Sequence, residues 1–199
     1  MRFKLGPIPD EFTPDSSWRP IREPSPLVMQ FFATPMALGM AFVVGYGWHW
    51  VGMPASLQFD VHDAAVFLFA LVLSFPALVV VHELLHAAVH PGWGLSHCTI
   101  LGAWPRRLLF YAHYSGPLSR NRFLCVFAMP FLVITVLPLG MAACGLKLPD
   151  TMKWAVAWVS TLNALAAGGD YFGILLISLQ VPQAAIVQNQ SWRTYWKPA

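Results

Sequence analysis

The chain has 199 residues, of which 57% are hydrophobic and only 11% are charged, and its formal net charge at pH 7 is +3. Soluble domains usually carry about a quarter of charged residues, so this composition excludes an ordinary soluble domain and favours an integral membrane protein. The small excess of positive charge is spread over the polar segments, which argues against a nucleic-acid-binding surface.

The first 26 residues are polar and rich in proline. They lack the charged, apolar and small-residue order of a cleaved signal peptide. We expect residues 1–26 to form a cytosolic tail that lies partly along the membrane, and a partner-docking motif is the alternative.

Four apolar stretches follow, and each is long enough for a helix that crosses a bilayer, which needs about 20 residues. They are Leu27–Trp50, Ala64–His90, Phe123–Leu146 and Met152–Val181. We therefore predict an all-α integral membrane protein whose four transmembrane helices form one domain, residues 27–187. Residues 188–199 are expected to be a cytosolic C-terminal tail.

The basic residues indicate the orientation. The N-terminal tail and the loop between the second and third spans hold most of them, whereas the first inter-helix loop, Val51–Asp63, has no Lys or Arg. The positive-inside rule then places both termini and the second loop in the cytosol.

Within the second loop, Ser96–Trp104 and Arg107–Tyr114 are rich in strand-forming residues and flank Pro105. This pattern predicts a hairpin or a re-entrant loop on the cytosolic side. Such a hairpin is able to pair with an extended substrate by strand addition. An interfacial loop without a role in substrate binding is the alternative.

The second span contains His82-Glu83-Leu84-Leu85-His86, which is an HExxH motif. Residues four apart share one face of a helix, so His82 and His86 are both able to reach one metal ion. Glu83 lies beside this pair, where a general base for a metal-activated water is needed.

A third ligand is expected in the fourth span. Of the nine acidic residues, only Glu83 and Asp170 lie deep inside apolar stretches, where an ionisable group costs about 2.5–3.5 kcal/mol or more unless it is paired or metal-bound. The predicted topology makes the second and fourth spans parallel, and a tilt or a kink at Gly168-Gly169 would bring Asp170 to the depth of the histidines. Two histidines and an aspartate form the three-ligand set of catalytic zinc; a hydrogen bond between helices is the alternative for Asp170.

Other candidate ligands are weaker. His90 continues the row of histidines, but it lies about 12 Å along the axis from His82, so we expect a helix-end residue. His97, Cys98 and His113 fall in the second loop, where a second metal site is an alternative. The three cysteines show no paired spacing, so no disulfide framework is expected.

Three pieces of this pattern match known families: His82–His86, Gly116–Phe123 leading to Met129-Pro130, and Asn163 through Asp170. Together they resemble the intramembrane zinc metalloproteases of the site-2 protease type, and they look like a membrane-embedded zincin peptidase family of bacterial proteins. The resemblance covers roughly residues 64–187 and implies a multi-pass protein of the bacterial inner membrane.

The resemblance also implies roles for single residues. His82, His86 and Asp170 would bind Zn²⁺, Glu83 would be the base, and Asn163 would hold the substrate or the developing oxyanion. The sequence departs from the site-2 pattern between Asn163 and Asp170, where it has no proline and is one residue shorter. A polar contact between helices is therefore the alternative for Asn163.

We expect a zinc-dependent metalloprotease that hydrolyses peptide bonds of membrane-associated substrates with Glu83 as general base. One alternative is a catalytically inactive membrane adaptor that keeps the zinc site, and another is a four-helix carrier of b-type haem with histidine ligands. The expected partners are the lipid bilayer and a membrane protein or peptide substrate. The sequence indicates no nucleic-acid partner and leaves the oligomeric state open.

Overall fold

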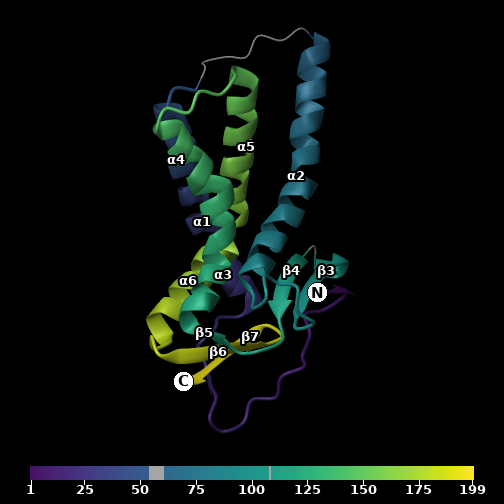
Figure 1. The fold of residues 1–199 in the computed structure, drawn as a ribbon, viewed down its shortest axis with the longest axis vertical. Helices are drawn as coiled ribbons and strands as arrows, with labels where there is room; N and C mark the ends of the chain where they lie inside the picture. The colour runs from purple at the N-terminus through teal and green to yellow at the C-terminus, as the bar shows by residue number, and fades with distance from the viewer. Residues whose placement is uncertain (54–60, 108) are drawn as a thin grey trace. The chain divides into compact units, whose positions relative to one another are not determined.

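The structure is a computed structural model that describes residues 1–53, 61–107 and 109–199 (Figure 1). Most of the predicted first loop, Val51–Asp63, therefore lies outside the described residues. The chain divides into two compact units. The first comprises Met1–Ala33, Glu83–Met129 and Gly169–Ala199, and the second comprises Thr34–His82 and Pro130–Gly168.

Within the described residues, three helical segments are long and apolar enough to cross a bilayer. They are α1 (Pro26–Trp50), α2 (Val61–Val89), and a segment made of α3 (Arg120–Pro130), the π-helical η2 (Phe131–Val136) and α4 (Leu137–Ala143). A fourth span results if α5 (Asp150–Ala166) and α6 (Gly168–Gln180) are counted as one bent pair. These segments coincide with the four predicted spans, and their apolar length is compatible with insertion into a membrane.

The surface of α2 is compatible with a membrane environment. Only 6% of the most apolar window of α2 is buried inside the protein. Exposed large apolar side chains on α2 include Val66, Leu68, Phe69, Val72 and Leu73. Water would penalise such a surface, whereas hydrocarbon accepts it because all backbone groups of a helix are bonded internally.

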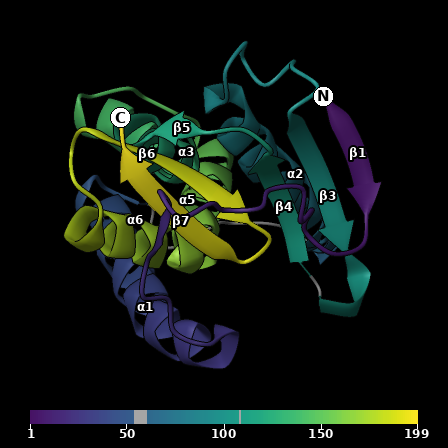
Figure 2. The ribbon, with the colours of Figure 1, turned by 90° about the horizontal axis from the view of Figure 1, so that it is seen from below.

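The prediction of an all-α protein is wrong, because the first unit contains two β-sheets (Figure 2). One sheet has the order β1 (Arg2–Leu5), β3 (Thr99–Trp104) and β4 (Leu109–Tyr114). The other has the order β2 (Arg19–Pro20), β7 (Arg193–Pro198), β6 (Ala185–Gln190) and β5 (Leu118–Ser119). Both terminal segments thus supply strands, and they do so by pairing with residues far away in the sequence.

The predicted hairpin in the second loop is confirmed. β3 and β4 are antiparallel from the pair Thr99–Tyr114 to the pair Trp104–Leu109. Pro105 follows β3 at once and begins the short 3₁₀ helix η1 (Pro105–Arg107), because its fixed φ and missing N–H suit a turn better than a strand. β1 pairs with β3 in parallel, so β4 is the outer strand of the sheet on the other side.

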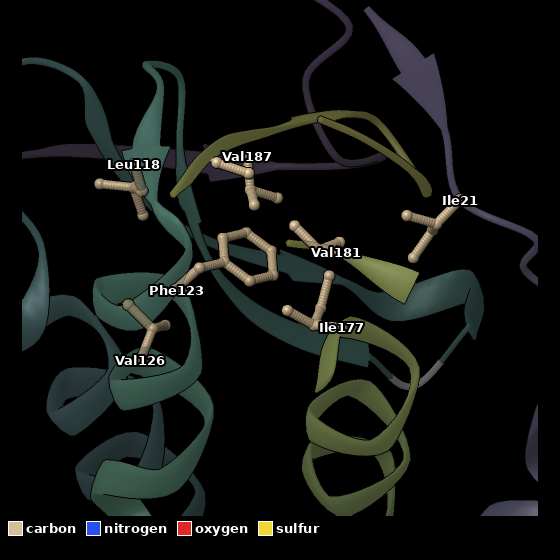
Figure 3. Close-up of a cluster of buried hydrophobic side chains, with 8 residues drawn as sticks. Ile21, Leu118, Phe123, Val126, Ile177, Val181 and Val187 are labelled. Carbon is tan, nitrogen blue, oxygen red and sulfur yellow. The ribbon is translucent and has the colours of Figure 1, made fainter. Parts of the chain in front are cut away.

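The core of the first unit joins the second sheet to α3 and α6 (Figure 3). Phe123 and Val126 come from α3, and Ile177 comes from α6. Leu118 and Val187, which are register partners in β5 and β6, pack against them. A shared apolar core of this kind fixes α3 and α6 relative to one another within the unit.

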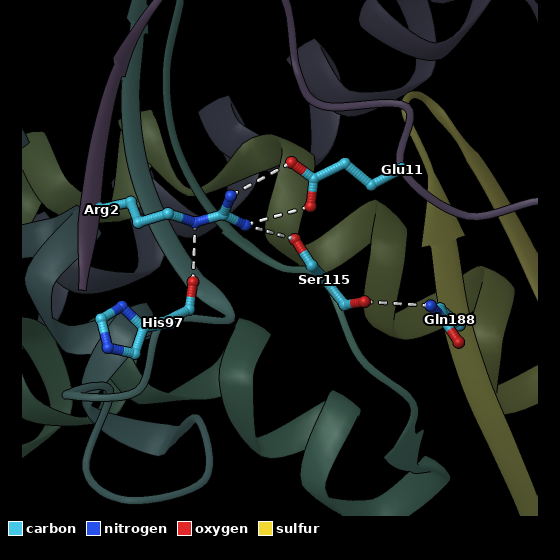
Figure 4. Close-up of polar contacts among 5 residues, drawn as sticks. All are labelled: Arg2, Glu11, His97, Ser115 and Gln188. Atoms are coloured by element: carbon cyan, nitrogen blue, oxygen red, sulfur yellow. Dashed lines mark hydrogen bonds and ion pairs between the residues drawn. The ribbon is translucent and has the colours of Figure 1, made fainter.

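A polar cluster holds the N-terminal segment (Figure 4). The Arg2 guanidinium donates to both carboxylate oxygens of Glu11, at 3.3 and 3.0 Å, and this contact lowers the pKa of Glu11. Arg2 also donates to the His97 carbonyl at 2.7 Å and to Ser115 Oγ at 3.4 Å. One arginine therefore connects β1 to the residues just before β3 and just after β4.

The face of the first sheet that holds His113 is covered. His113 is buried, and burial lowers its pKa to about 4, with Glu11 acting in the opposite direction and Lys4 and Arg2 in the same direction. The Tyr111 hydroxyl, on the same face, donates to the carbonyls of Gly6 and Pro7 at 3.3 and 3.2 Å. The segment that follows β1 thus closes this face of the sheet.

The buried His113 predicts a loss of stability in mild acid. Its pKa is lower in the folded state than the unfolded value of about 6.5, so the unfolded state binds more protons between that value and about pH 4. The free energy of unfolding should therefore fall by up to about 1.4 kcal/mol per pH unit as the pH decreases through this window. Thermal unfolding of the detergent-purified protein at pH 7 and pH 5 measures the slope. His113→Gln should make it shallower, and an unchanged slope in this variant would contradict the assignment.

Candidate metal centre

Helix α2 carries the two histidines of the HExxH motif. His82 and His86 are one turn apart, which is about 6 Å along the axis, and both side chains are buried. The helix ends at Val89, and Pro91 follows. Gly94, at φ +76°, then turns back onto the last helical turn, where a Cβ would lie 2.3 Å from the Ala87 carbonyl oxygen. Only glycine fits there, so the helix has a fixed end one turn after His86.

Asp170 comes from the first turn of α6. Helix α5 ends at Ala166, and the Ala167 N–H donates to the Asn163 carbonyl at 2.9 Å. Helix α6 begins anew at Gly168, which agrees with the kink predicted near Gly168-Gly169. A carboxylate in the first turn of a helix is favoured by the helix dipole.

The three predicted ligands come together. The Oδ1 atom of Asp170 lies 3.5 Å from His86 Nε2. His82, His86 and Asp170 each offer a ligand atom within 4.8 Å of the others, and all three side chains are buried or half-buried. Among the described residues, no other group of three such side chains meets this criterion. The second metal site considered for His97, Cys98 and His113 is therefore not supported by the part of the chain that the structure describes.

The hydrogen bonds of His86 fix its tautomer. Its Nδ1 lies 2.7 Å from the Val126 carbonyl oxygen. A carbonyl only accepts, so Nδ1 carries the hydrogen and Nε2 keeps the lone pair that a metal requires. Pro130, four residues after Val126, explains why this carbonyl is available: it lacks the N–H that would take up the Val126 carbonyl in a regular helix.

His82 is fixed in the same way by a side chain. Its Nδ1 lies 2.9 Å from Asn163 Oδ1. The amide orientation follows from the other end of Asn163, whose Nδ2 donates to the Pro130 carbonyl at 3.2 Å and to Thr135 Oγ1 at 3.0 Å. The amide oxygen therefore accepts from His82, and the lone pair of this imidazole is also on Nε2.

The Asn163 side chain lies in a buried polar network. Thr135 Oγ1 donates to the Ser160 carbonyl at 3.0 Å, and Ser160 Oγ donates to the Thr135 carbonyl at 3.3 Å. Asn163, Thr135 and Ser160 are each about 0% exposed. These contacts hold Asn163 against His82; the substrate-binding role expected from the sequence stays a prediction.

Two of these contacts were missed by the sequence reasoning. Thr135 is a lone hydroxyl in an apolar span, which is a weak signal because such residues often bond within their own helix. The Val126 contact comes from the backbone and has no side-chain signal. The indirect signal is Pro130, because a proline inside a helix frees the carbonyl four residues earlier.

Two further polar residues lie in or directly after α2: Glu83 and His90. Glu83 follows His82 directly and is half-buried. His90 is the first residue after the helix, as expected, and its Nδ1 lies 3.3 Å from Thr99 Oγ1. Burial lowers the pKa of His90 to about 4, so it is neutral at pH 7.

No curated protein and no solved structure matches this chain. A family model described as "Putative zincin peptidase" matches residues 75–186, which is more than half of the chain. The match contains the HExxH motif, Asn163 and Asp170, which are the residues that the structure brings together. The chain therefore belongs to the family that carries this description.

Proposed function

We propose that the protein is an intramembrane zinc-dependent peptidase that hydrolyses peptide bonds of membrane-associated substrates. The observation that carries the proposal is the group His82, His86 and Asp170, with both imidazoles presenting Nε2 as the basic nitrogen. The family match supports the same chemistry. The position of the motif inside an apolar span, α2, supports action within the membrane.

The donor set fits zinc. Two neutral imidazoles and one carboxylate leave a position open in a tetrahedral shell, which is the ligand set of catalytic rather than structural zinc sites. Each imidazole donates its other N–H to an oxygen, as metal-binding histidines almost always do. A zinc ion bound there would polarise the scissile carbonyl and acidify water.

Glu83 is proposed as the general base. It would take the proton of the attacking water and later deliver it to the leaving amine. Its place directly after His82 keeps it beside the ligands while the histidines face the ion.

The substrate would be bound in an extended form. A peptide bond in a helix is shielded, so a segment that spans a membrane must be locally unwound before water attacks it. β1 and β4 are the two outer strands of this sheet, and β4 belongs to the hairpin that follows α2, the helix of the HExxH motif. We place the substrate segment along β4, where backbone hydrogen bonds would hold it.

The role of Glu83 is tested by Glu83→Gln. This variant should retain zinc but lose peptide hydrolysis by about 10²–10⁴-fold, because only the proton acceptor is removed. Cleavage of a fluorogenic single-span peptide in proteoliposomes, together with the zinc content of the same preparation, measures both effects. If the wild type and Glu83→Gln bind zinc equally and the variant supports the same cellular phenotype, the inactive adaptor is the better description.

The ligand set is tested by metal analysis of detergent-purified protein. We expect the wild type to hold one zinc ion per chain, and His86→Ala and Asp170→Ala to lose it. His90→Gln is the matched control, since it changes a histidine one turn further along and should keep the ion. Retention of zinc in Asp170→Ala would assign the third ligand to another residue.

The contact between Asn163 and His82 predicts a change in metal affinity. Asn163→Ala should weaken zinc binding by about 10–100-fold, because the His82 tautomer and ring orientation are no longer fixed. Competition with a zinc chelator measures this affinity. Ser160→Ala, which alters the same polar network without touching His82, should have a smaller effect. An unchanged zinc affinity with a raised KM would instead support the substrate-binding role for Asn163.

A further inference from the structure

The register of the first sheet separates its side chains into two faces. Residues paired across strands share a face, and successive residues alternate. Phe3 pairs with Leu101, and Leu101 pairs with Ala112; Leu5, Ala103 and Phe110 form the second such row. We call these residues the apolar face: Phe3, Leu5, Leu101, Ala103, Phe110 and Ala112.

On the opposite face, Ile100, Tyr111 and His113 of β3 and β4 are only 2%, 7% and 6% exposed. Arg2 and Lys4 of β1 lie on the same face and are exposed. Residues 6–7 cover it through their hydrogen bonds to the Tyr111 hydroxyl. The β3 and β4 side chains at the centre of this face are thus packed on protein, and its exposed β1 residues are charged and not apolar.

Three residues of the apolar face are exposed, and Leu101, Ala103 and Ala112 are half-buried. The exposed fractions of Phe3, Leu5 and Phe110 are 82%, 83% and 49%. None of its six residues carries a charge or a polar side-chain atom. An exposed apolar surface of this kind, on an ordered sheet, marks contact with a membrane or another molecule.

The apolar face is turned toward the end of the membrane-spanning helix α2. By the same alternation, Thr99 and Tyr114 lie on this face. His90, which directly follows α2, bonds Thr99 Oγ1 and lies with its ring 5.2 Å from that of Tyr114. The end of α2 therefore packs on the same side of the sheet as the apolar face. In a membrane, lipid would surround α2.

The connecting loop and the hairpin tip have the composition of a membrane interface. Trp93 and Leu95, between α2 and β3, are 82% and 75% exposed. At the tip, Arg106 and Arg107 are exposed, and the Arg107 guanidinium lies 5.0 Å from the centre of the Trp104 ring. The three strands and the tip contain no acidic residue. Tryptophan and arginine of this kind match the headgroup region and its anionic lipids.

We propose that the sheet β1-β3-β4 is a monotopic membrane element. Its apolar face lies in the boundary between headgroups and acyl chains of the leaflet in which α2 ends, and its basic tip contacts anionic headgroups. Elements of this type place an apolar side about 5–10 Å into that boundary. The proposal concerns lipid contact and does not depend on peptidase activity.

The test compares neighbouring positions on opposite faces of β1. In the full-length chain, with Cys98, Cys125 and Cys144 replaced by serine, Leu5→Cys and Lys4→Cys are each labelled with the fluorophore NBD. The proteins are reconstituted into phosphatidylcholine and phosphatidylglycerol vesicles, with and without brominated acyl chains. We expect blue-shifted emission and several-fold stronger bromolipid quenching at position 5 than at position 4.

Phe3→Cys, on the same face, provides an independent probe if the variant at position 5 does not fold, and a single monodisperse peak in size-exclusion chromatography serves as the folding check. Equal quenching at both faces, or no quenching at positions 3 and 5, would overturn the proposal. Shielding of position 5 that appears only on raising the protein concentration would also overturn it, because the face would then contact a second copy of the chain.

Discussion

The site depends on two hydrogen bonds that each hold an imidazole by its Nδ1. Without them the histidines of an HExxH motif could turn either nitrogen toward the ion, and in an apolar span each wrong arrangement would leave a polar group unsatisfied. The Val126 carbonyl and the Asn163 amide oxygen accept these bonds at 2.7 and 2.9 Å. Both acceptors depend on Pro130: its missing N–H frees the Val126 carbonyl, and its own carbonyl orients Asn163. Pro130 therefore contributes to the orientation of both imidazoles, and Thr135 Oγ1, which also accepts from Asn163 Nδ2, completes the orientation of His82.

The third ligand depends on the break between α5 and α6. An uninterrupted helix would place Asn163 and Asp170 two turns apart on one rod, about 10 Å along its axis. Because α5 ends at Ala166, Asp170 falls in the first turn of a new helix, where the helix dipole favours a negative charge. The carboxylate then meets His86 at 3.5 Å. The same break keeps Asn163 on α5. The short segment 163–170 therefore supplies the candidate ligand Asp170 and also Asn163, which holds the candidate ligand His82.

The apolar spans, the grouping of His82, His86 and Asp170, and the hairpin were predictable because each has a local signal. Apolar length identifies a span, the four-residue spacing aligns His82 and His86, and Asp170 is conspicuous as a carboxylate in an apolar stretch. The sheets were missed because their partners are remote, as in the pairing of Arg2 with Ile100. A strand of two residues such as β2 has no periodicity to detect. Asn163 was recognised in the sequence as a polar residue in an apolar span. Its contact with His82 was not, because that contact arises from tertiary packing between α2 and α5.

His90 physically connects the metal centre to the sheet. It lies one turn beyond His86, about 6 Å along α2, and its side chain bonds Thr99 at the start of β3. A sheet that lies on the bilayer would therefore be held at the depth where α2 ends, only one turn from a ligand. A substrate segment extended along β4 would then be kept at the membrane surface, and the unwinding that hydrolysis requires would occur where water is already present. In the proposed mechanism, the strands that the sequence did not reveal would determine where the substrate is bound, and the helices would supply the side chains that hold the metal ion.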